Sequence, residues 1–267
     1  MAYFDIKDFG AVTDGKTLAT KAIQKAIDTC HEQGGGTVYF GAGTYYSGTI
    51  ILKSHVCLYL DAGSTLLGSS ELKDYQEIYP SYHSFIDKQT HCALVFAENQ
   101  VNISLQGTGT IDGNGGHANF QTHKDNDPNR PFCIRFVKCQ GIRVQDLVLK
   151  NSAQWLQHYQ ACQDVQVRGI RVFNHCNENN DGIDIDGCKN VTLSDCLIVC
   201  YYDAICLKSS GPAVCENVVV SNCVLSSHCN GIKLGTETTG GFRNIRVSNC
   251  LLKVSDTGGD HTNGLPF

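Results

Sequence analysis

The sequence predicts an all-β fold in which parallel strands stack into a single β-solenoid, with one coil for each internal repeat. The prediction depends on a repeat of nearly constant length, short strand-like segments inside it, and turn residues at fixed positions. From about residue 139, the segments CQGIRVQDLVL, CQDVQVRGIRVF, CKNVTLSDCLIV, CENVVVSNCVLS and FRNIRVSNCLLK align with one another. Their anchor positions are 23, 26, 27 and 27 residues apart, at Gly141, Asp164, Asn190, Asn217 and Asn244.

The content of each repeat indicates strands rather than helices. Short β-prone segments such as VTL and VVV are separated by Asn, Asp and Ser, which are typical turn residues. Helical repeats of this length would show apolar faces with a period of 3.6 over ten or more residues, and such faces are missing from the repeats. The recurrence of Asn190, Asn217 and Asn244 predicts a ladder of side chains along one turn of the solenoid.

Seven of the 15 cysteines follow the same period. There is no CxxC pair, and neither metal sites nor disulfides require a constant spacing of about 27 residues. We interpret the periodic cysteines as one structural position that is refilled by a small buried thiol on each coil. They form two series, Cys139, Cys162, Cys188 and Cys215, and Cys196, Cys223 and Cys250. We therefore expect free thiols, no metal site and no cofactor.

The N-terminal segment differs from the repeats. The run TLATKAIQKAIDTCHEQGGG has apolar residues at Leu18, Ala22, Ile23, Ala26 and Ile27, a pattern typical of an amphipathic helix that ends at a glycine run. A solenoid must cover its first open coil, so we expect residues of about 1–35 to form an N-terminal cap. Strands follow in TVYF, YYSGTIIL and VCLYL.

The rest of the chain predicts one domain over residues 1–267, because no linker interrupts it. The polar interruptions at 70–92 and 114–131 are expected on the binding face, where insertions into solenoids usually lie. The chain stops at NGLPF without a second helix, which predicts a truncated or uncapped C-terminal end that is available for self-association.

Charge and hydropathy narrow the choice of partners. A net charge of −5 disfavours nucleic acid and anionic membranes as partners, and no apolar run approaches the length of a membrane helix. The N-terminus shows no leader, but a leader removed beforehand would leave the same sequence. The localisation is therefore unknown, and secretion or a periplasmic location stays open.

Three stretches share one form, a polar turn followed by a strand that carries charges: NENNDGIDID at 177–186, YYDAICLKS at 201–209 and HCNGIKLG at 228–235. Alternation along a strand predicts that the aliphatic residues, Ile183, Ile185, Ile205, Leu207, Ile232 and Leu234, face the core. The charged residues Asp184, Asp186, Lys208 and Lys233 then share the outer face of one sheet. Asp181 and Asp203 lie at its rim, about 4.8 Å apart if they occupy equivalent positions on neighbouring coils.

Several motifs resemble those of known enzymes. FDIKDFGAVTDG, the helix ending in GGGTVYF, and AGTYYSGTIILKSHVCLYLDAGSTLLGS look like the opening segment of pectin-degrading β-helix enzymes. GTGTIDGNG and NSAQWLQHYQACQDVQV are similar to the next coils of glycoside hydrolase family 28, the polygalacturonase family, and NNDGIDI resembles its NTDG motif. The ordered series GTIDG, NS..W..H, N.DGIDI and.DAI.LKS is the most specific part of the match.

The resemblance implies a right-handed parallel β-helix that hydrolyses pectic polysaccharide with inversion. The family's NTD aspartate corresponds to Asp181, and the second aspartate of its DD pair corresponds to Asp203. The first aspartate of that pair, the family's general acid, falls on Tyr202. The histidine of its GHG motif falls on Asn230, with His228 two residues earlier, and its RIK motif would lie at or beyond the end of this chain.

These correspondences lead to a hypothesis for the site. Inverting hydrolysis needs carboxyl groups about 6.5–9.5 Å apart, so Asp181 and Asp203 are expected to share activation of the water. The proton donor would be Tyr202, His228, or one of the two aspartates with a pKa raised by its neighbour. Substrate-binding candidates are Asp184, Lys208, Lys233, Asn230, His158 and Trp155, although Trp155 and His158 could equally serve packing.

We therefore expect a glycoside hydrolase that acts on an acidic, galacturonate-containing polysaccharide or oligosaccharide. The first alternative is a catalytically inactive β-helix that binds carbohydrate. The second alternative is a polysaccharide lyase or epimerase on the same scaffold, which would use Ca²⁺ and an Arg or Lys base. The sequence does not distinguish exo from endo attack.

Overall fold

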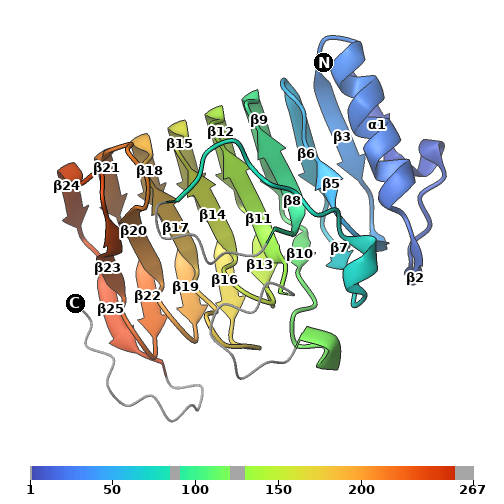
Figure 1. The fold of residues 1–267 in the computed structure, drawn as a ribbon. Coiled ribbons are helices and arrows are strands. Elements are labelled where there is room, and N and C mark those ends of the chain that lie inside the picture. Colours follow the sequence, from blue (N-terminus) through green and yellow to red (C-terminus); the bar gives the residue numbers. More distant parts are fainter. Residues whose placement is uncertain (1, 85–90, 121–129, 256–267) are drawn as a thin grey trace.

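The computed structural model describes residues 2–84, 91–120 and 130–255, and it shows a right-handed parallel β-helix. Three parallel sheets run along the axis, and each coil between the first and the last described ones contributes one strand to each sheet (Figure 1). The first sheet, sheet A, contains β1 (Tyr3–Asp5), β3 (Gly36–Phe40), β6 (Val56–Leu60), β9 (Val101–Gly107), β12 (Gln140–Gln145), β15 (Gln163–Arg168), β18 (Lys189–Ser194), β21 (Cys215–Ser221) and β24 (Phe242–Ser248).

The other two sheets complete each coil. Sheet B contains β2 (Asp14–Leu18), β4 (Gly43–Ser47), β7 (Ser64–Gly68), β10 (Thr110–Asp112), β13 (Val148–Lys150), β16 (Arg171–Asn174), β19 (Leu197–Cys200), β22 (Val224–Ser227) and β25 (Leu251–Val254). Sheet C contains β5 (Ile50–Ile51), β8 (Ala93–Glu98), β11 (Phe132–Val137), β14 (Gln157–Gln160), β17 (Ile183–Asp186), β20 (Ile205–Ser209) and β23 (Ile232–Thr238).

The repeat period sets the strand register. In sheet A, Val165 pairs with Val191, and Val191 pairs with Val218, so each predicted repeat forms one coil. The inward-facing aliphatic residues of successive coils therefore stack into one continuous core that extends from Ile6 to Ile232. Burial of this apolar column favours the folded state, since each buried side chain contributes about 1.5–3 kcal/mol.

The predicted asparagine ladder is confirmed. The Asn190 amide donates to Asp164 Oδ1 at 2.9 Å, Asn217 donates to Asn190 at 3.0 Å, and Asn244 donates to Asn217 at 2.9 Å. These residues adopt left-handed backbone angles with φ between 55° and 58°, a conformation that Asn and Asp tolerate better than most residues. The ladder thus holds the same tight turn on four successive coils. A parallel ladder at Asp195, Asn222 and Asn249 was not predicted.

The prediction for the cysteines also holds. All fifteen are free thiols, and the two periodic series are buried in the core except for the half-buried Cys250. The thiols donate to backbone carbonyls of their own or a neighbouring coil, as Cys162 does to the carbonyl of Phe136 at 3.4 Å. They act as small core side chains, as their period indicated.

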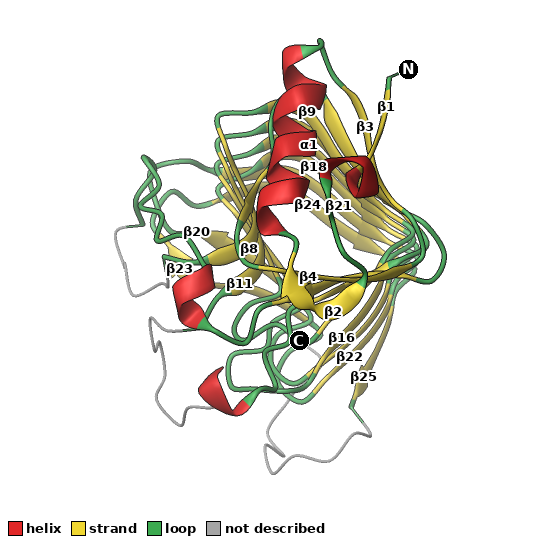
Figure 2. Cartoon of the chain, turned by 90° about the vertical axis from the view of Figure 1, so that its right-hand side faces the viewer, coloured by secondary structure: helices red, strands yellow, loops and turns green. Residues whose placement is uncertain are grey.

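The expected N-terminal helix is α1 (Thr20–Glu32), which buries Ile23, Ala26 and Ile27. In the end-on view of Figure 2 it lies across the stacked coils at the N-terminal end. The expectation that Leu18 belongs to its apolar face is wrong: Leu18 ends β2 and is 48% exposed. Three short 3-10 helices complete the described structure, η1 (Ile6–Phe9), η2 (Leu72–Asp74) and η3 (Ala118–Phe120).

Two expectations concern residues outside the described ranges. The predicted open C-terminal end involves residues 256–267, and the polar interruptions at 70–92 and 114–131 each include an undescribed segment. Among the described helices, none has the length and apolar character needed to cross a bilayer.

Candidate active site

The loops that lead from sheet B into sheet C bring the predicted site residues together. Ile183 pairs with Ile205, and Ile205 pairs with Ile232, across β17, β20 and β23. Counting back two residues from each isoleucine places Asp181, Asp203 and Asn230 at equivalent positions on three successive coils. Backbone bonds of 2.8 Å from Gly182 N to the Asp203 carbonyl and from Ala204 N to the Asn230 carbonyl confirm this register.

The side of sheet C opposite the core carries the predicted charged residues. Across sheet C, Asp184 on β17 pairs with His158 on β14 and with Cys206 on β20. Cys206 in turn pairs with Lys233 on β23. Asp186 pairs in the same way with Lys208. The predicted alternation is therefore correct for β17 and β20, since Ile183, Ile185, Ile205 and Leu207 belong to the core.

The expectation of an open outer face is wrong, however. Asp184 and Asp186 are 0% exposed and Lys208 is 3% exposed. Buried charges need partners, and Asp186 and Lys208 have them. Leu234, expected in the core, is 52% exposed. The reason is that β23 is the last strand of sheet C in the described chain, and its register against β20 shifts after Leu207.

Lys208 is the centre of one cluster. Its Nζ lies 3.6 Å from Asp184 Oδ1, 3.1 Å from Glu237 Oε2, and 4.6 Å from the centroid of the Trp155 ring. Burial alone would lower the pKa of Lys208, but the neighbouring anionic groups raise it overall, so the ammonium stays charged. Glu237 was not predicted as a site residue. Its position depends on the register shift in β23, which strand alternation does not reveal.

Asp203 is the centre of a second cluster. Its Oδ1 accepts a hydrogen bond from the Asn230 amide at 2.6 Å, and its Oδ2 accepts one from Lys233 Nζ at 2.8 Å. The Asp203 side chain is 1% exposed. Both oxygens of Asp203 thus accept a hydrogen bond from a nitrogen donor of the next coil.

Asp181 and Asp184 lie in a different electrostatic environment. Burial, and then the charges of Asp184 and Asp203, raise the pKa of Asp181 well above its usual value. Burial likewise raises the pKa of Asp184 to about 8, although Lys208 acts in the opposite direction. Asp181 Oδ1 and both oxygens of Asp184 accept no hydrogen bond from any residue in the described ranges. The site therefore combines Asp203, whose two oxygens are both hydrogen-bonded, with two carboxyl groups whose raised pKa values favour the protonated state.

A buried network borders these carboxyl groups. His158 Nε2 lies 3.3 Å from Asp186 Oδ2, which also accepts a hydrogen bond from the Ser210 hydroxyl, while Ser210 N donates to Asp186 Oδ1 at 2.8 Å. Burial lowers the pKa of His158, which favours the neutral imidazole. The rings of Trp155 and His158 pack edge to face with centroids 5.2 Å apart. His158 thus lies beside Asp186 and Trp155 beside Lys208, and His158 is fully buried.

The structure gives different surroundings to the two other candidate proton donors. The Tyr202 ring is half-buried with Lys233 Nζ 5.8 Å from its centroid, and burial raises its pKa, which makes the phenol a weaker acid. His228 packs against His175 and Tyr201, with ring centroids 5.5 and 5.7 Å away. The raised pKa of Tyr202 makes its phenol a poorer proton donor than the Asp181 carboxyl group.

Within residues 2–84, 91–120 and 130–255, no group of three or more His, Cys, Asp or Glu side chains is arranged to hold a metal ion. The acidic side chains instead face ammonium and amide groups. The chemistry that these groups support directly is proton transfer and the binding of sugar hydroxyls.

The chain is similar to several known proteins. Residues 38–259 match the sequence model described as "Glycosyl hydrolases family 28". The chain is 33% identical over 212 residues to a "Probable polygalacturonase" of Vitis vinifera, covering 76% of this chain and 43% of that protein. It is 40% identical over 119 residues to an "Exo-poly-alpha-D-galacturonosidase" of Dickeya chrysanthemi, covering 42% of this chain and 19% of that protein.

Among solved structures, an exopolygalacturonase of Thermotoga maritima superimposes with a TM-score of 0.84 at 24% identity, covering 93% of this chain and 66% of that one. This likeness shows the fold. The chain spans less than half the length of the two curated relatives described above.

Proposed function

Because the chain belongs to glycosyl hydrolase family 28, we propose that it hydrolyses galacturonate-containing pectic polysaccharide or oligosaccharide, with inversion at the anomeric carbon. The observation that carries this proposal is the different bonding of two buried carboxyl groups. Both oxygens of Asp203 accept hydrogen bonds, from Lys233 and Asn230, whereas Asp181 Oδ1 accepts none from the described residues and burial raises the pKa of Asp181 well above its usual value. Hydrolysis requires one group of each kind, a base and an acid.

In this proposal Asp203 accepts the proton of the attacking water and Asp181 protonates the departing glycosidic oxygen. The assignment of Asp181 to the acid rather than to the water depends on its raised pKa and on an Oδ1 with no hydrogen-bond partner in the described residues. Asp203 accepts its two hydrogen bonds from Asn230 and Lys233 of the next coil, on the side away from the coil that carries Asp181.

Substrate binding would use the residues around these two acids. Lys208 and Lys233 already pair with carboxylates of the site, so a uronate carboxylate must share them with Glu237 and Asp203. Protonation of Asp184 releases Lys208 from one of its two partners and favours binding of an anionic sugar. Trp155 offers an aromatic surface to the sugar ring beside Lys208.

The proposal is tested with defined pectic oligosaccharides incubated in oxygen-18-labelled water, with products analysed by mass spectrometry. Hydrolysis places one labelled oxygen at each new reducing end. An unsaturated product, sensitive to chelators, would instead show a lyase. Binding without any product over long incubation would show an inactive carbohydrate-binding β-helix.

A further inference from the structure

We infer that the outer side of sheet A carries a second binding site for uronate oligosaccharides, near the N-terminal end of the solenoid and apart from the acids of sheet C. The site is a groove of about 550 Å³ over β3, β6, β9 and β12, which are neighbours in the sheet (Figure 1). A volume of this size is typical of ligand sites. The inference goes beyond the proposed function, because the groove is lined by residues of a different sheet from the catalytic candidates.

A row of small side chains forms the floor of the groove. Thr37, Cys57 and Ser104 occupy one register position on three neighbouring strands and line the groove. They face away from the core, since the next residue on each strand is buried in it. On the following strand the same position holds Arg143. The groove is therefore the space left above three short side chains, and a long cationic side chain closes one end of it.

An aromatic side chain forms one wall. Tyr59 lies two positions beyond Cys57 on the same side of β6 and is 36% exposed. Its ring stacks on the ring of Tyr39, with centroids 6.2 Å apart and planes inclined by 15°. Tyr39 is fixed in turn, because its hydroxyl donates to Asp61 Oδ2 at 2.5 Å. The wall thus presents a fixed, partly exposed aromatic ring, which can pack against the C–H face of a sugar.

Polar groups form the opposite wall. Asn102 Nδ2 lies 3.3 Å from His55 Nδ1, and both residues line the groove. The glycine turn after α1 packs against His55, since Gly36 N donates to the His55 carbonyl at 3.0 Å. Amide and imidazole groups donate hydrogen bonds to sugar hydroxyls and accept them. The groove therefore faces an aromatic wall with a polar one, as recognition of a sugar ring requires.

The charge of the groove favours an anionic sugar. Arg143 is exposed, and the described residues that line the groove include no aspartate or glutamate. Two other arginines of sheet A, Arg168 and Arg243, each pair with a carboxylate, whereas Arg143 has no such pair among the described residues. A guanidinium binds a carboxylate through two parallel hydrogen bonds. Arg143 thus supplies the contact that selects a uronate over a neutral sugar.

The length of the groove indicates an oligosaccharide. Three strand spacings of about 4.8 Å separate β3 from β12, which gives roughly 14 Å. This length holds a short row of linked pyranose rings along the solenoid axis. The carboxylate of one ring would then meet Arg143 while another ring packs against Tyr59, which lies two strands away. A single sugar would reach only one of these two residues.

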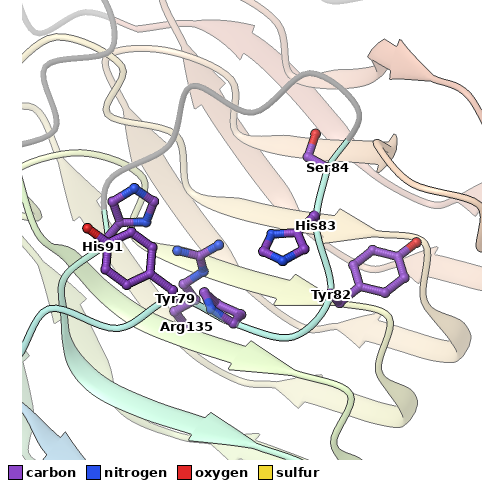
Figure 3. Close-up of a pocket in the computed structure, with 7 residues that line it drawn as sticks. Tyr79, Tyr82, His83, Ser84, His91 and Arg135 are labelled. Atoms are coloured by element: carbon purple, nitrogen blue, oxygen red, sulfur yellow. The ribbon is translucent and has the colours of Figure 1, made fainter.

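Another pocket, beside sheet C, is too small for this role. It lies under the segment of residues 79–84, where Tyr79, His83 and His91 line it together with Arg135 (Figure 3). Its volume is about 30 Å³, roughly the space of one water molecule. Of these two pockets, the groove on sheet A is the one with room for a sugar ring.

Calorimetric titration tests the site with a galacturonate trisaccharide that carries sulfur in place of each glycosidic oxygen and so resists hydrolysis. We expect Arg143→Gln to lower the affinity for one bound trisaccharide per protein about tenfold or more, because a charge-assisted hydrogen bond is lost. Tyr59→Ala should weaken the same site. Unchanged binding in Arg143→Gln would overturn the inference.

The matched control is Arg246→Gln. Arg246 is exposed and occupies the same register position as Arg143, but on β24, outside the groove. The control should bind the trisaccharide as the native protein does, and thermal unfolding checks that all three variants fold. An equal loss of affinity in Arg246→Gln would show a general effect of surface charge and would overturn the site.

The methyl ester of the same trisaccharide tests the class of ligand. The ester keeps the sugar rings but lacks their negative charge, so its affinity should change little between the native protein and Arg143→Gln. A loss of affinity for the ester as large as the loss for the free acid would contradict recognition of a uronate carboxylate by Arg143.

The titration also separates this inference from the proposed function. If the acids of sheet C bind no pectic sugar, the native protein still binds one trisaccharide, and Arg143→Gln still weakens it. If the protein hydrolyses pectic substrates, Arg143→Gln should raise KM for long galacturonate polymers without changing kcat, because the groove tethers the polymer. A native protein that hydrolyses the polymer, with KM and trisaccharide binding both unchanged in Arg143→Gln, would overturn the groove alone.

Discussion

Lys233 Nζ lies 2.8 Å from Asp203 Oδ2, and this pair joins the last two strands of sheet C in the described chain. The Asp203 side chain is 1% exposed, whereas Lys233 is 25% exposed and reaches the surface. The Asn230 amide holds the other oxygen of Asp203. The resemblance to family 28 motifs aligns Asn230 with the histidine of the GHG motif. The pair Asn230 and Lys233 thus orients the carboxylate that we assign as the base.

Replacement of Lys233 by Met should impair catalysis more than folding. The change leaves Asp203 buried with one donor instead of two, and we expect kcat/KM to fall about 100-fold. The free energy of unfolding should fall by about 1–3 kcal/mol, the cost of an unsatisfied charged group. Lys189→Met is the matched control, since Lys189 pairs with Glu216 on the exposed surface of sheet A. Equal kinetic losses in both variants would contradict a specific role for Lys233.

Asp181→Asn and Asp203→Asn should differ in their dependence on the leaving group. If Asp181 is the acid, Asp181→Asn should lose about 10²–10⁴-fold in rate on natural glycosides, but much less on a glycoside with an acidic phenol leaving group that needs no protonation. Asp203→Asn should be impaired on both substrates. Equal recovery of the two variants with the activated glycoside would exclude this division of roles.

Stability should depend on pH through Asp184. Its pKa is raised from 3.8 to about 8 in the folded protein, so protonation favours the folded state. The contribution of Asp184 to stability is fully present below pH 3.8 and is lost as pH rises toward 8, at no more than about 1.4 kcal/mol per pH unit. Asp184→Asn does not ionise. The unfolding temperature of the variant, relative to the native protein, should therefore rise between pH 4 and pH 8, as measured by calorimetry. A difference in unfolding temperature that stays constant between pH 4 and pH 8 would contradict the raised pKa of Asp184.

Two substitutions at Asn217 separate the contribution of its side-chain hydrogen bonds to stability from the contribution of its left-handed backbone conformation. Asn217→Ala removes two side-chain hydrogen bonds and places alanine at φ 57°, and it should lower the free energy of unfolding by about 2 kcal/mol. Asn217→Gly removes the same bonds but tolerates the backbone angle, so it should cost about 1 kcal/mol less than alanine. Chemical denaturation of both variants checks this difference, and an alanine variant as stable as the glycine variant would contradict it.

The sequence period was sufficient to predict the architecture of the coils. A residue that recurs every 27 positions must occupy one place in the repeat, and Asn190, Asn217 and Asn244 do so. Strand alternation also placed Asp184 and Lys208 on the side opposite the core. Strand alternation predicts which side of the sheet a side chain faces. It does not predict whether other parts of the chain cover and bury that side. Asp184 is fully buried, and its partner Lys208 lies over the ring of Trp155, which is far from both in sequence.

The remaining errors have local causes. Leu234 follows the same alternation as Leu207 but lies on the last described strand of sheet C, where no further strand covers it. Glu237 reaches Lys208 only because the register of β23 shifts, and a register shift leaves no periodic pattern in the sequence. The roles of Asp181, Asp203, Tyr202 and His228 stay predictions. Their environments now favour Asp181 over Tyr202 as the proton donor.

The central claim is that a hydrolase site is built around Asp203. It is tested most directly by incubating galacturonate oligosaccharides in oxygen-18-labelled water with the native protein and with Asp203→Asn. The account predicts that the native protein yields products with one labelled oxygen at each new reducing end, and that Asp203→Asn yields at least 100-fold less. An unsaturated product, or undiminished turnover by Asp203→Asn, would contradict it.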